Sequence, residues 1–381
     1  MKPKIILLVF SLFLSLNLKA QSVSLKLDQI LVLGEGNSNR SELMFSGIRL
    51  IKSTKIGSRI FVADMSDNSI RVFNSESKFL SKIGGRGRGP GEFLQVTSFE
   101  ILDDQSIVVL DRFLNRVTYF DSVGTVTNTI SLGQSIPVNS AMSLYTNTDD
   151  NTHYILYRDY QSKENSHLIL NFDTNFESTL NSFVDVFKYF YDSSNPLEFN
   201  ISQRPAYLST TFGTNKVAIF SDTFTGTFAI FDKHTKREAL IGNPIQDHIK
   251  LYDWNKKNSY SERGETGYAS LSTQQGKYFF KLKGSNFGLV GNSNLLLQFF
   301  GKYVGKKIEP YLNIFNNEGK FITTIPLQNH PVDFISDRNT FSIIPHFLDE
   351  NYNLYVSDYD YKGKYPAVRI FKTNLKNFVE N

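Results

Sequence analysis

The residues best suited to chemistry form a glycine-rich run that ends at Glu92. Glycines alternate with Arg86 and Arg88 between Gly84 and Gly91. Backbone amides around glycines can cradle an anion, but the run lacks the Lys-Ser/Thr ending of a nucleotide-binding P-loop. A tight turn that needs left-handed backbone also explains the glycines, and we expect the Glu92 carboxylate to accept backbone hydrogen bonds there. Arg86 and Arg88 are then either a solvated pair or ligand-binding residues for an acidic polysaccharide or another carboxylate.

A second candidate is an aromatic stretch within the long polar segment from Gly242 to Phe287. It carries the only tryptophan, Trp254, together with Tyr260 and Tyr268. Aromatic side chains stack on sugar rings and anchor protein partners at low entropic cost. The alternative is an aromatic plug that packs on the protein's own surface. Trp254, Tyr260 and Tyr268 are therefore candidate ligand-binding residues.

Acidic residues recur at the ends of short apolar runs. Carboxylates that converge in space suit calcium or a sugar, whereas an aspartate that follows a strand also caps backbone amides in a turn. Turn capping is the simpler interpretation of each one. The four residues are Asp64, Asp111, Asp222 and Asp358.

Catalytic signatures are missing from the sequence. There is no cysteine, no serine in a Gly-x-Ser-x-Gly elbow and no pair of histidines at HxH or HExxH spacing. Catalytic residues therefore stay unassigned, and the sequence predicts neither a metal site nor a cofactor, although calcium or zinc remains the alternative. The six histidines are His153, His167, His234, His248, His330 and His346.

The elements that would position these residues follow a repeat. A short apolar strand that ends near aspartate, a polar turn and a second strand that ends in phenylalanine recur along the chain, as in Ile60 to Phe73 and Ile107 to Phe120. The spacing is 47 to 84 residues, which is typical of β-propeller blades. The unit from Val96 to Leu132 contains four strands and three turns, as one blade requires. The six markers are Phe73, Phe120, Phe172, Phe231, Phe315 and Phe371.

The sequence therefore predicts an all-β fold, a six-bladed β-propeller of four-stranded antiparallel blades. The segment from Val23 to Leu33 resembles an outer strand without inner strands before it, whereas the last unit runs short after Lys372. We expect the N-terminal strand to complete the last blade and close the ring. Each phenylalanine should pack between neighbouring blades. Long insertions are expected near 181–207 and 242–286, within one domain over residues 21–381.

The first twenty residues read as a secretory signal peptide. Lys2 and Lys4 precede an apolar run too short to span a membrane, and Ala20 precedes polar residues. Removal of Lys2, Lys4 and Lys19 from the 41 basic residues leaves 38 against 37 acidic ones. This balance gives no bulk attraction for nucleic acid. We expect a periplasmic or secreted protein without a transmembrane segment after cleavage, and the absence of cysteine argues against a lipid anchor.

The phrase from Ile83 to Phe93, Ile-Gly-Gly-Arg-Gly-Arg-Gly-Pro-Gly-Glu-Phe, is followed by a blade. In this it resembles the six-bladed β-propeller family of exported Bacteroidota proteins, which look related to NHL-repeat propellers. The resemblance implies the fold and export but no agreed activity.

Two functions from different classes fit the sequence. The first is a binding or scaffold protein that recognises a glycan, a peptide or a cell-envelope protein on one propeller face. The second is a metal-dependent propeller enzyme, a lyase or lactonase acting on a sugar derivative. The histidines and acids show no readable metal arrangement, so the binding protein is favoured.

Overall fold

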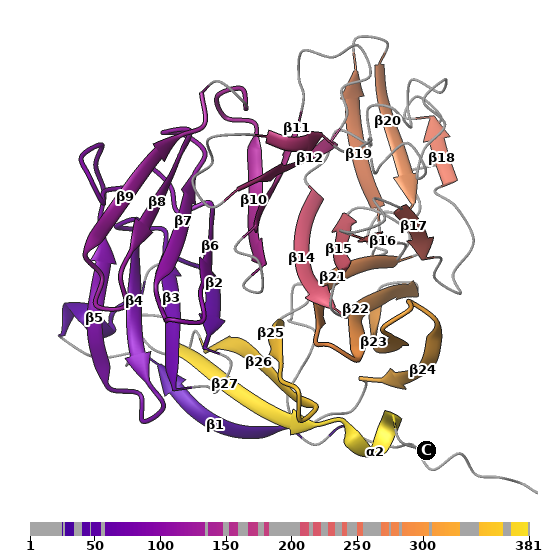
Figure 1. The fold of residues 1–381 in the computed structure, drawn as a ribbon. Helices are drawn as coiled ribbons and strands as arrows, with labels where there is room; N and C mark the ends of the chain where they lie inside the picture. Colours follow the sequence, from indigo (N-terminus) through magenta and orange to yellow (C-terminus); the bar gives the residue numbers. More distant parts are fainter. Residues whose placement is uncertain are drawn as a thin grey trace, which may run out of the picture.

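Antiparallel β-strands make up almost all the regular structure in the computed structural model (Figure 1). Within the described residues, helix is limited to η1 (Ser41–Leu43) and α2 (Lys376–Val379). The structure describes residues 25, 27–33, 40–45, 47–54, 58–133, 136–147, 152–158, 167–173, 179–182, 206–212, 216–221, 228–232, 238–241, 250–253, 268–273, 276–281, 284–304, 307–327, 343–360 and 367–379.

The first three sheets have four strands each, hydrogen-bonded in chain order. All neighbouring strands in these sheets are antiparallel. The strands are β2 (Ile48–Ser53), β3 (Arg59–Asp64), β4 (Ser69–Asn74) and β5 (Phe79–Gly84); β6 (Ser98–Ile101), β7 (Ile107–Asp111), β8 (Arg116–Phe120) and β9 (Val126–Ser131); and β10 (Ala141–Asn147), β11 (Thr152–Arg158), β12 (His167–Phe172) and β13 (Thr179–Ser182).

Three further four-stranded sheets follow, and the last of them combines the two ends of the chain. The strands are β14 (Ala206–Phe212), β15 (Lys216–Ser221), β16 (Phe228–Asp232) and β17 (Glu238–Ile241); β21 (Gly284–Gly291), β22 (Leu295–Val304), β23 (Lys307–Asn316) and β24 (Phe321–Pro326); and β25 (Ile344–Leu348), β26 (Asn353–Asp360), β27 (Ala367–Asn374) and β1 (Asp28–Leu33).

The first strand of each sheet contacts the first strand of the next. The contacting pairs are β2 with β6, β6 with β10, β10 with β14, β14 with β21, β21 with β25, and β25 with β2. We call the six sheets blades 1 to 6 in the order β2–β5, β6–β9, β10–β13, β14–β17, β21–β24 and β25–β27 with β1. The first strand of each is its inner strand and the fourth its outer strand.

The marker phenylalanines pack between blades, as expected. Phe120 lies in one buried cluster with Phe61 of blade 1, Phe172 with Val108 of blade 2, and Phe371 with Leu297 of blade 5. Phe73 and Phe315 likewise contact the preceding blade. A single sheet cannot bury both of its faces, so these contacts hold the blades together. The side chain of Phe231 lies outside the described residues.

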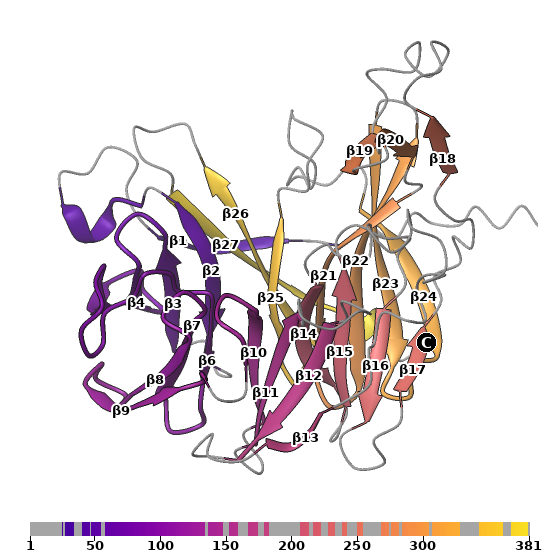
Figure 2. The same ribbon diagram turned by 90° about the horizontal axis from the view of Figure 1, so that it is seen from above.

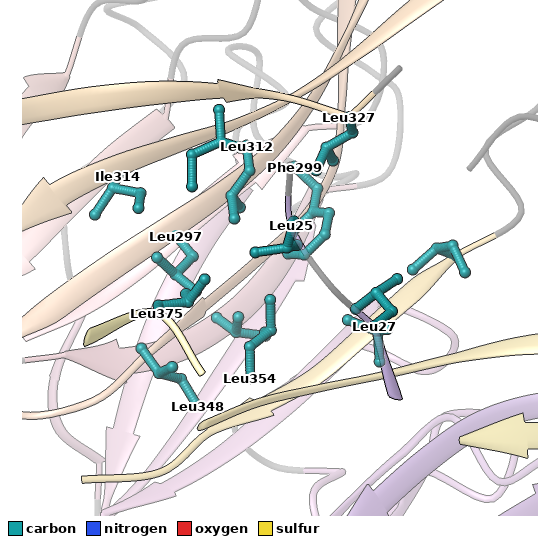
Figure 3. Close-up of a cluster of buried hydrophobic side chains, with 14 of the residues drawn as sticks. Leu25, Leu27, Leu297, Phe299, Leu312, Ile314, Leu327, Leu348, Leu354 and Leu375 are labelled. Carbon is teal, nitrogen blue, oxygen red and sulfur yellow. The ribbon is translucent and has the colours of Figure 1, made fainter. Parts of the chain in front are cut away.

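Strand β1 pairs with β27, the pairing expected for the N-terminal segment. Gln29 lies opposite Phe371, and Leu33 lies opposite Val368. Figure 1 shows indigo β1 alongside yellow β27. Figure 3 shows Leu25 and Leu27, just before β1, in the same cluster as Leu375 from the other end of the chain. The two ends of the chain are therefore tied together by hydrogen bonds and by buried apolar side chains.

The long insertion after β17, for which the sequence predicts no strands, contains a sheet. Strands β18 (Lys250–Asp253), β19 (Tyr268–Thr273) and β20 (Gly276–Lys281) form a three-stranded antiparallel sheet in the order β18-β20-β19. Aromatic residues such as Tyr278 and Phe279 favour extended structure, and β19 pairs antiparallel with β20.

Candidate functional site

The glycine-rich run forms a folded-back loop between β5 and β6. Gly84 and Gly91 have φ of +73° and +75°, in the left-handed region that favours glycine. A Cβ on Gly84 would lie 2.3 Å from the buried Phe93 ring, so a side chain does not fit there. The Phe93 amide donates to the Gly85 carbonyl at 2.7 Å, and the Gly87 amide donates to the Phe93 carbonyl at 3.1 Å. The loop is thus pinned on the Phe93 side chain and backbone.

Two side chains hold further backbone groups of this loop. The Glu92 carboxylate accepts a hydrogen bond from the Gly89 amide at 2.7 Å, as predicted. The Arg116 guanidinium, from β8, donates to the carbonyls of Arg88 at 3.1 Å, Gly89 at 2.8 Å and Glu92. A carboxylate of the protein itself lies against the glycine backbone, since a Cβ on Gly87 would stand 2.0 Å from Glu92 Oε2. The loop is therefore a fixed turn and not an anion-binding nest.

Arg86 and Arg88 extend from this fixed turn into solvent. Both are exposed. Among the residues that the structure describes, neither guanidinium has a hydrogen-bond or ion-pair partner. The bonds of Glu92 and Arg116 hold the backbone that carries them, so little ordering of the main chain remains when a ligand binds.

The remaining candidates belong to the insertion after β17. Trp254 and Tyr260 lie outside the described residues, and Tyr268 begins β19. Because strands alternate in direction, each connection from an outer strand to the next inner strand leaves a blade at the end that also carries the turn between the second and third strands. The glycine-rich loop, η1 and the insertion are all such connections. Figure 2 shows η1 and the β18–β20 sheet projecting on one side of the ring. We call this side the connection face.

The recurrent aspartates hold turns and linkers. Asp111 is buried, and its Oδ2 accepts from the Leu94 and Gln95 amides at 2.7 and 3.2 Å. Its Oδ1 accepts from the amides of Phe113 and Leu114 at 2.9 and 3.0 Å. Four amides thus saturate one carboxylate, which joins the turn after β7 to the linker before β6.

Asp64 does the same in blade 1, where its Oδ1 accepts from the Gly47 and Ser66 amides and its Oδ2 pairs with Arg71 at 3.2 Å. Asp358 was expected after a strand but lies within β26, opposite Arg369, which holds it with two guanidinium nitrogens. Asp222 lies outside the described residues. None of the three described carboxylates faces another in a way that would hold a cation.

Two of the six histidines have described side chains. His153 is buried between blades 2 and 3, with Nδ1 2.8 Å from Thr146 Oγ1 and Nε2 2.7 Å from Tyr119 Oη. Burial raises the pKa of Tyr119 well above its ordinary value. His346 is described below. Over the described ranges, no three His, Asp or Glu side chains come together as metal ligands would.

A cluster of polar side chains lies on the inner strands of three blades, and the spacing of residues in the sequence could not reveal it. Lys52 of β2 pairs with Glu100 of β6 at 2.7 Å, with side chains 30% and 15% exposed. His346 of β25 lies near Lys52, and its Nε2 is 2.6 Å from Ser357 Oγ. Lys52, Ser53, His346 and Tyr355 line a small cavity of about 30 Å³, enough for one water molecule.

Burial shifts the pKa values of Glu100 and His346 so that each side chain favours its neutral form. Burial raises the pKa of Glu100, and the Lys52 charge acts against that. Burial lowers the pKa of His346 to about 4, a hydrogen bond with the Ile51 backbone opposes the shift, and the Lys52 charge adds to it. His346 is therefore neutral at pH 7 and joins blade 6 to blade 1 through β2.

Comparisons with known proteins agree with this architecture. A model of the DUF5128 family, described as a 6-bladed beta-propeller, matches residues 39–217. The protein is a six-bladed β-propeller. The resemblance to the six-bladed propellers of exported Bacteroidota proteins is confirmed. The described residues of the propeller include no helix with the length and hydropathy that a membrane span needs.

Two solved Bacteroides structures share the fold of this propeller. A presumed exported protein of Bacteroides fragilis is 12% identical, with a TM-score of 0.54 and coverage of 92% of this chain and 96% of that one. A member of the DUF4221 family from Bacteroides vulgatus is 11% identical, with a TM-score of 0.55 and coverage of 93% and 100%. No curated protein matches the propeller. At such low identities the likeness extends to the fold alone.

Proposed function

We propose that the propeller is a binding protein that acts outside the cytoplasm, in the periplasm or after secretion, and recognises its partner with the connection face. The observation that carries this proposal is the contrast within the glycine-rich loop. Glu92 holds the Gly89 amide and Arg116 holds the Arg88 and Gly89 carbonyls, whereas the side chains of Arg86 and Arg88 are exposed. Two cations on a rigid turn suit a partner with negative charge.

The topology supports the same side of the molecule for the aromatic candidates. Trp254, Tyr260 and Tyr268 belong to the insertion between β17 and β21, which is an outer-to-inner connection like the glycine-rich loop. Aromatic and arginine side chains are the residue types that dominate binding energy in protein interfaces. The partner is a glycan, a peptide or a cell-envelope protein.

Binding of the mature chain to polygalacturonate, poly-L-glutamate and neutral dextran tests the proposal by surface plasmon resonance. The R86A/R88A variant should lose binding on the order of tenfold, because two charge contacts disappear. The matched control is K78A/K320A, which removes two exposed cations from turns between third and fourth strands, at the opposite end of the blades. Equal losses in both variants, or no binding by the native chain, would contradict the proposal.

A further inference from the structure

The contact between β25 of blade 6 and β2 of blade 1, which we call the joint, contains a β-bulge at His346. In β25 the register passes from Pro345 opposite Val356 to Phe347 opposite Tyr355, which leaves His346 as the extra residue. Bulges re-aim side chains and are over-represented beside functional sites. Here the bulge brings an imidazole ring into the joint between two blades.

The bulge of β25 lies at a different level from the bulge of the inner strand in blade 1. In β2 the extra residue, Arg49, lies opposite Ala63 and Asp64, three and four residues beyond the residue that faces the marker phenylalanine. In blade 6 the residue that faces the marker is Val356, directly at the bulge. The extra residue is therefore placed further from the connection face and within the seam.

His346 crosses the joint and lies beside a cation. Its ring makes a hydrogen bond with the Ile51 backbone of β2, and its Nε2 is 2.6 Å from Ser357 Oγ of its own blade. Burial and the Lys52 charge lower the pKa of His346 to about 4, although the Ile51 bond opposes the shift. The Lys52 ammonium is itself paired with Glu100 at 2.7 Å. Protonation of the histidine thus puts a second cation beside Lys52 in a partly buried contact.

Strands β21 and β26 also pack against β25, and the groups that they supply do not offset this charge. The sequence of β21, Gly284–Gly291, has no titratable residue. On β26, Tyr355 lines the same cavity as the histidine, whereas Asp358 lies on the other face of the strand and is held by Arg369. The remaining titratable side chains of β2 and β26 lie outside the described residues, namely Arg49, Tyr359 and Asp360.

A cavity and an unpaired hydroxyl weaken the packing of the joint. The cavity of about 30 Å³ is bordered by His346 and Ser53 and by the apolar side chains of Ile60 and Ile370. Ser53 Oγ is buried and has no hydrogen-bond partner among the described residues. A void forfeits packing contacts, and an unpaired buried hydroxyl costs free energy while the joint is closed. The joint therefore gives up less on opening than a completely filled seam does.

We propose that the joint is an acid-sensitive opening of the ring, in which protonation of His346 beside Lys52 separates β25 from β2 and admits water to the seam. The two side chains and the cavity lie between the blades, so opening does not require the strand pairing within either blade to break. The inference concerns the ring itself and goes beyond the proposed function, because no residue of the connection face takes part in it.

Thiol labelling of the full mature chain tests the inference, because the sequence contains no cysteine. I60C places one buried thiol at the cavity. I107C places one at the equivalent position between blades 1 and 2, since both isoleucines are buried and lie opposite a marker phenylalanine. The rate of reaction of I60C with 2,2′-dithiodipyridine, divided by that of I107C, should rise on the order of tenfold from pH 7.5 to pH 5.0. In the H346Q background the ratio should stay constant, because glutamine takes up no proton.

The control is H153Q, which removes the other described buried histidine, between blades 2 and 3, and should leave the rise in place. A ratio that is independent of pH, or a rise that persists in H346Q, would overturn the inference. Equal rises at both thiols would also overturn it, because the whole ring would then loosen together. Melting temperatures at pH 7.5 check that the variants are folded, and H346N replaces H346Q if the latter is not. None of these outcomes bears on binding by the connection face.

Discussion

In blades 1 and 2 the second strand ends at a buried aspartate, whereas in blade 5 the equivalent strand continues. Ile60, Ile107 and Leu296 lie opposite the marker phenylalanines of their blades. Four residues further on, the first two blades have Asp64 and Asp111 and the fifth has Phe300. Strands β22 and β23 are ten residues long, against five or six for β3, β4, β7 and β8.

The difference shows what the aspartate does. Its carboxylate collects the amides of the turn and of a linker, so those amides no longer take part in strand pairing. Phe300 cannot accept hydrogen bonds, and the ladder continues to the pair Val304 and Lys307. One residue type thus decides how far a blade's central hairpin extends toward the connection face.

The polar interiors of these blades differ as well. Arg71, two residues before its marker phenylalanine, pairs with Asp64. Asn313, two residues before Phe315, donates to Gln298 Oε1 at 2.9 Å. Gln298 donates to Asn286 on the inner strand, and Thr324 on the outer strand donates to Asn313 at 2.7 Å. Blade 5 therefore replaces an ion pair with a ladder of three neutral amides and one hydroxyl that crosses all four strands.

The largest effect is expected from Asp64→Ala. Arg71 is only 5% exposed, and loss of the carboxylate leaves its charge buried against the Met44 carbonyl and the more distant Asp67. Unfolding in urea should show a loss of about 3–5 kcal/mol. Asp121→Ala, which removes a cap from an exposed turn, is the control and should cost far less. Equal losses would mean that the buried ion pair does not distinguish blade 1.

His346, the titratable side chain between blades 6 and 1, is a third kind of polar contact to compare with the ion pair and the amide ladder. Because the folded-state pKa of His346 is about 4, below the ordinary 6.5, the unfolded chain takes up its proton first. Stability from this group is complete above pH 6.5 and falls as the pH drops toward 4, by at most about 3 kcal/mol. Some of the ring surface is accessible, so that figure is a ceiling.

Melting temperatures of the native chain and His346→Gln over pH 4 to 7.5 check this prediction. The native chain should lose more stability on acidification than the variant. Glu100, whose raised pKa acts in the opposite direction, and the charge of Lys52 are present in both proteins and cancel in the difference. Parallel pH curves would show that the histidine is not coupled to the joint.

A smaller effect is expected from Gln298→Leu in blade 5. The change leaves the buried amides of Asn286 and Asn313 each without one partner, at a cost of about 1–3 kcal/mol in the free energy of unfolding. Asn128→Leu, on the exposed outer strand β9, is the control and should lie within about 0.5 kcal/mol of the native chain. A loss above that of Asp64→Ala would reverse the order of the two interiors.

Much of the fold was readable from the sequence because it depends on local patterns. The interval from Asp64 to Phe73 recurs from Asp111 to Phe120, and the four strands expected between Val96 and Leu132 are β6 to β9. The role of Glu92 followed from a carboxylate next to glycines. Asp358 was misplaced because it follows apolar residues yet pairs directly with Arg369 inside a strand, a contact set by the neighbouring strand.

The polar cluster on the inner strands was harder to predict from the sequence, because its residues come from distant segments. Lys52, Glu100 and His346 meet only when three inner strands come together, and nothing in their local sequence sets them apart. Arg86 and Arg88 stay candidates, as do Trp254, Tyr260 and Tyr268.

The pairing of β1 with β27 has a consequence for the order in which the molecule forms. Gln29 meets Phe371, so the first strand to be synthesised waits for nearly the last before its edge is covered. The closing of so large a loop is entropically costly and slow. Until then, one side of blades 5 and 6 lacks Leu25 and Leu27, and the exposed strand edge is open to another chain. A chaperone that covers this edge during folding would raise the yield of native protein more than it would raise the stability of the folded protein.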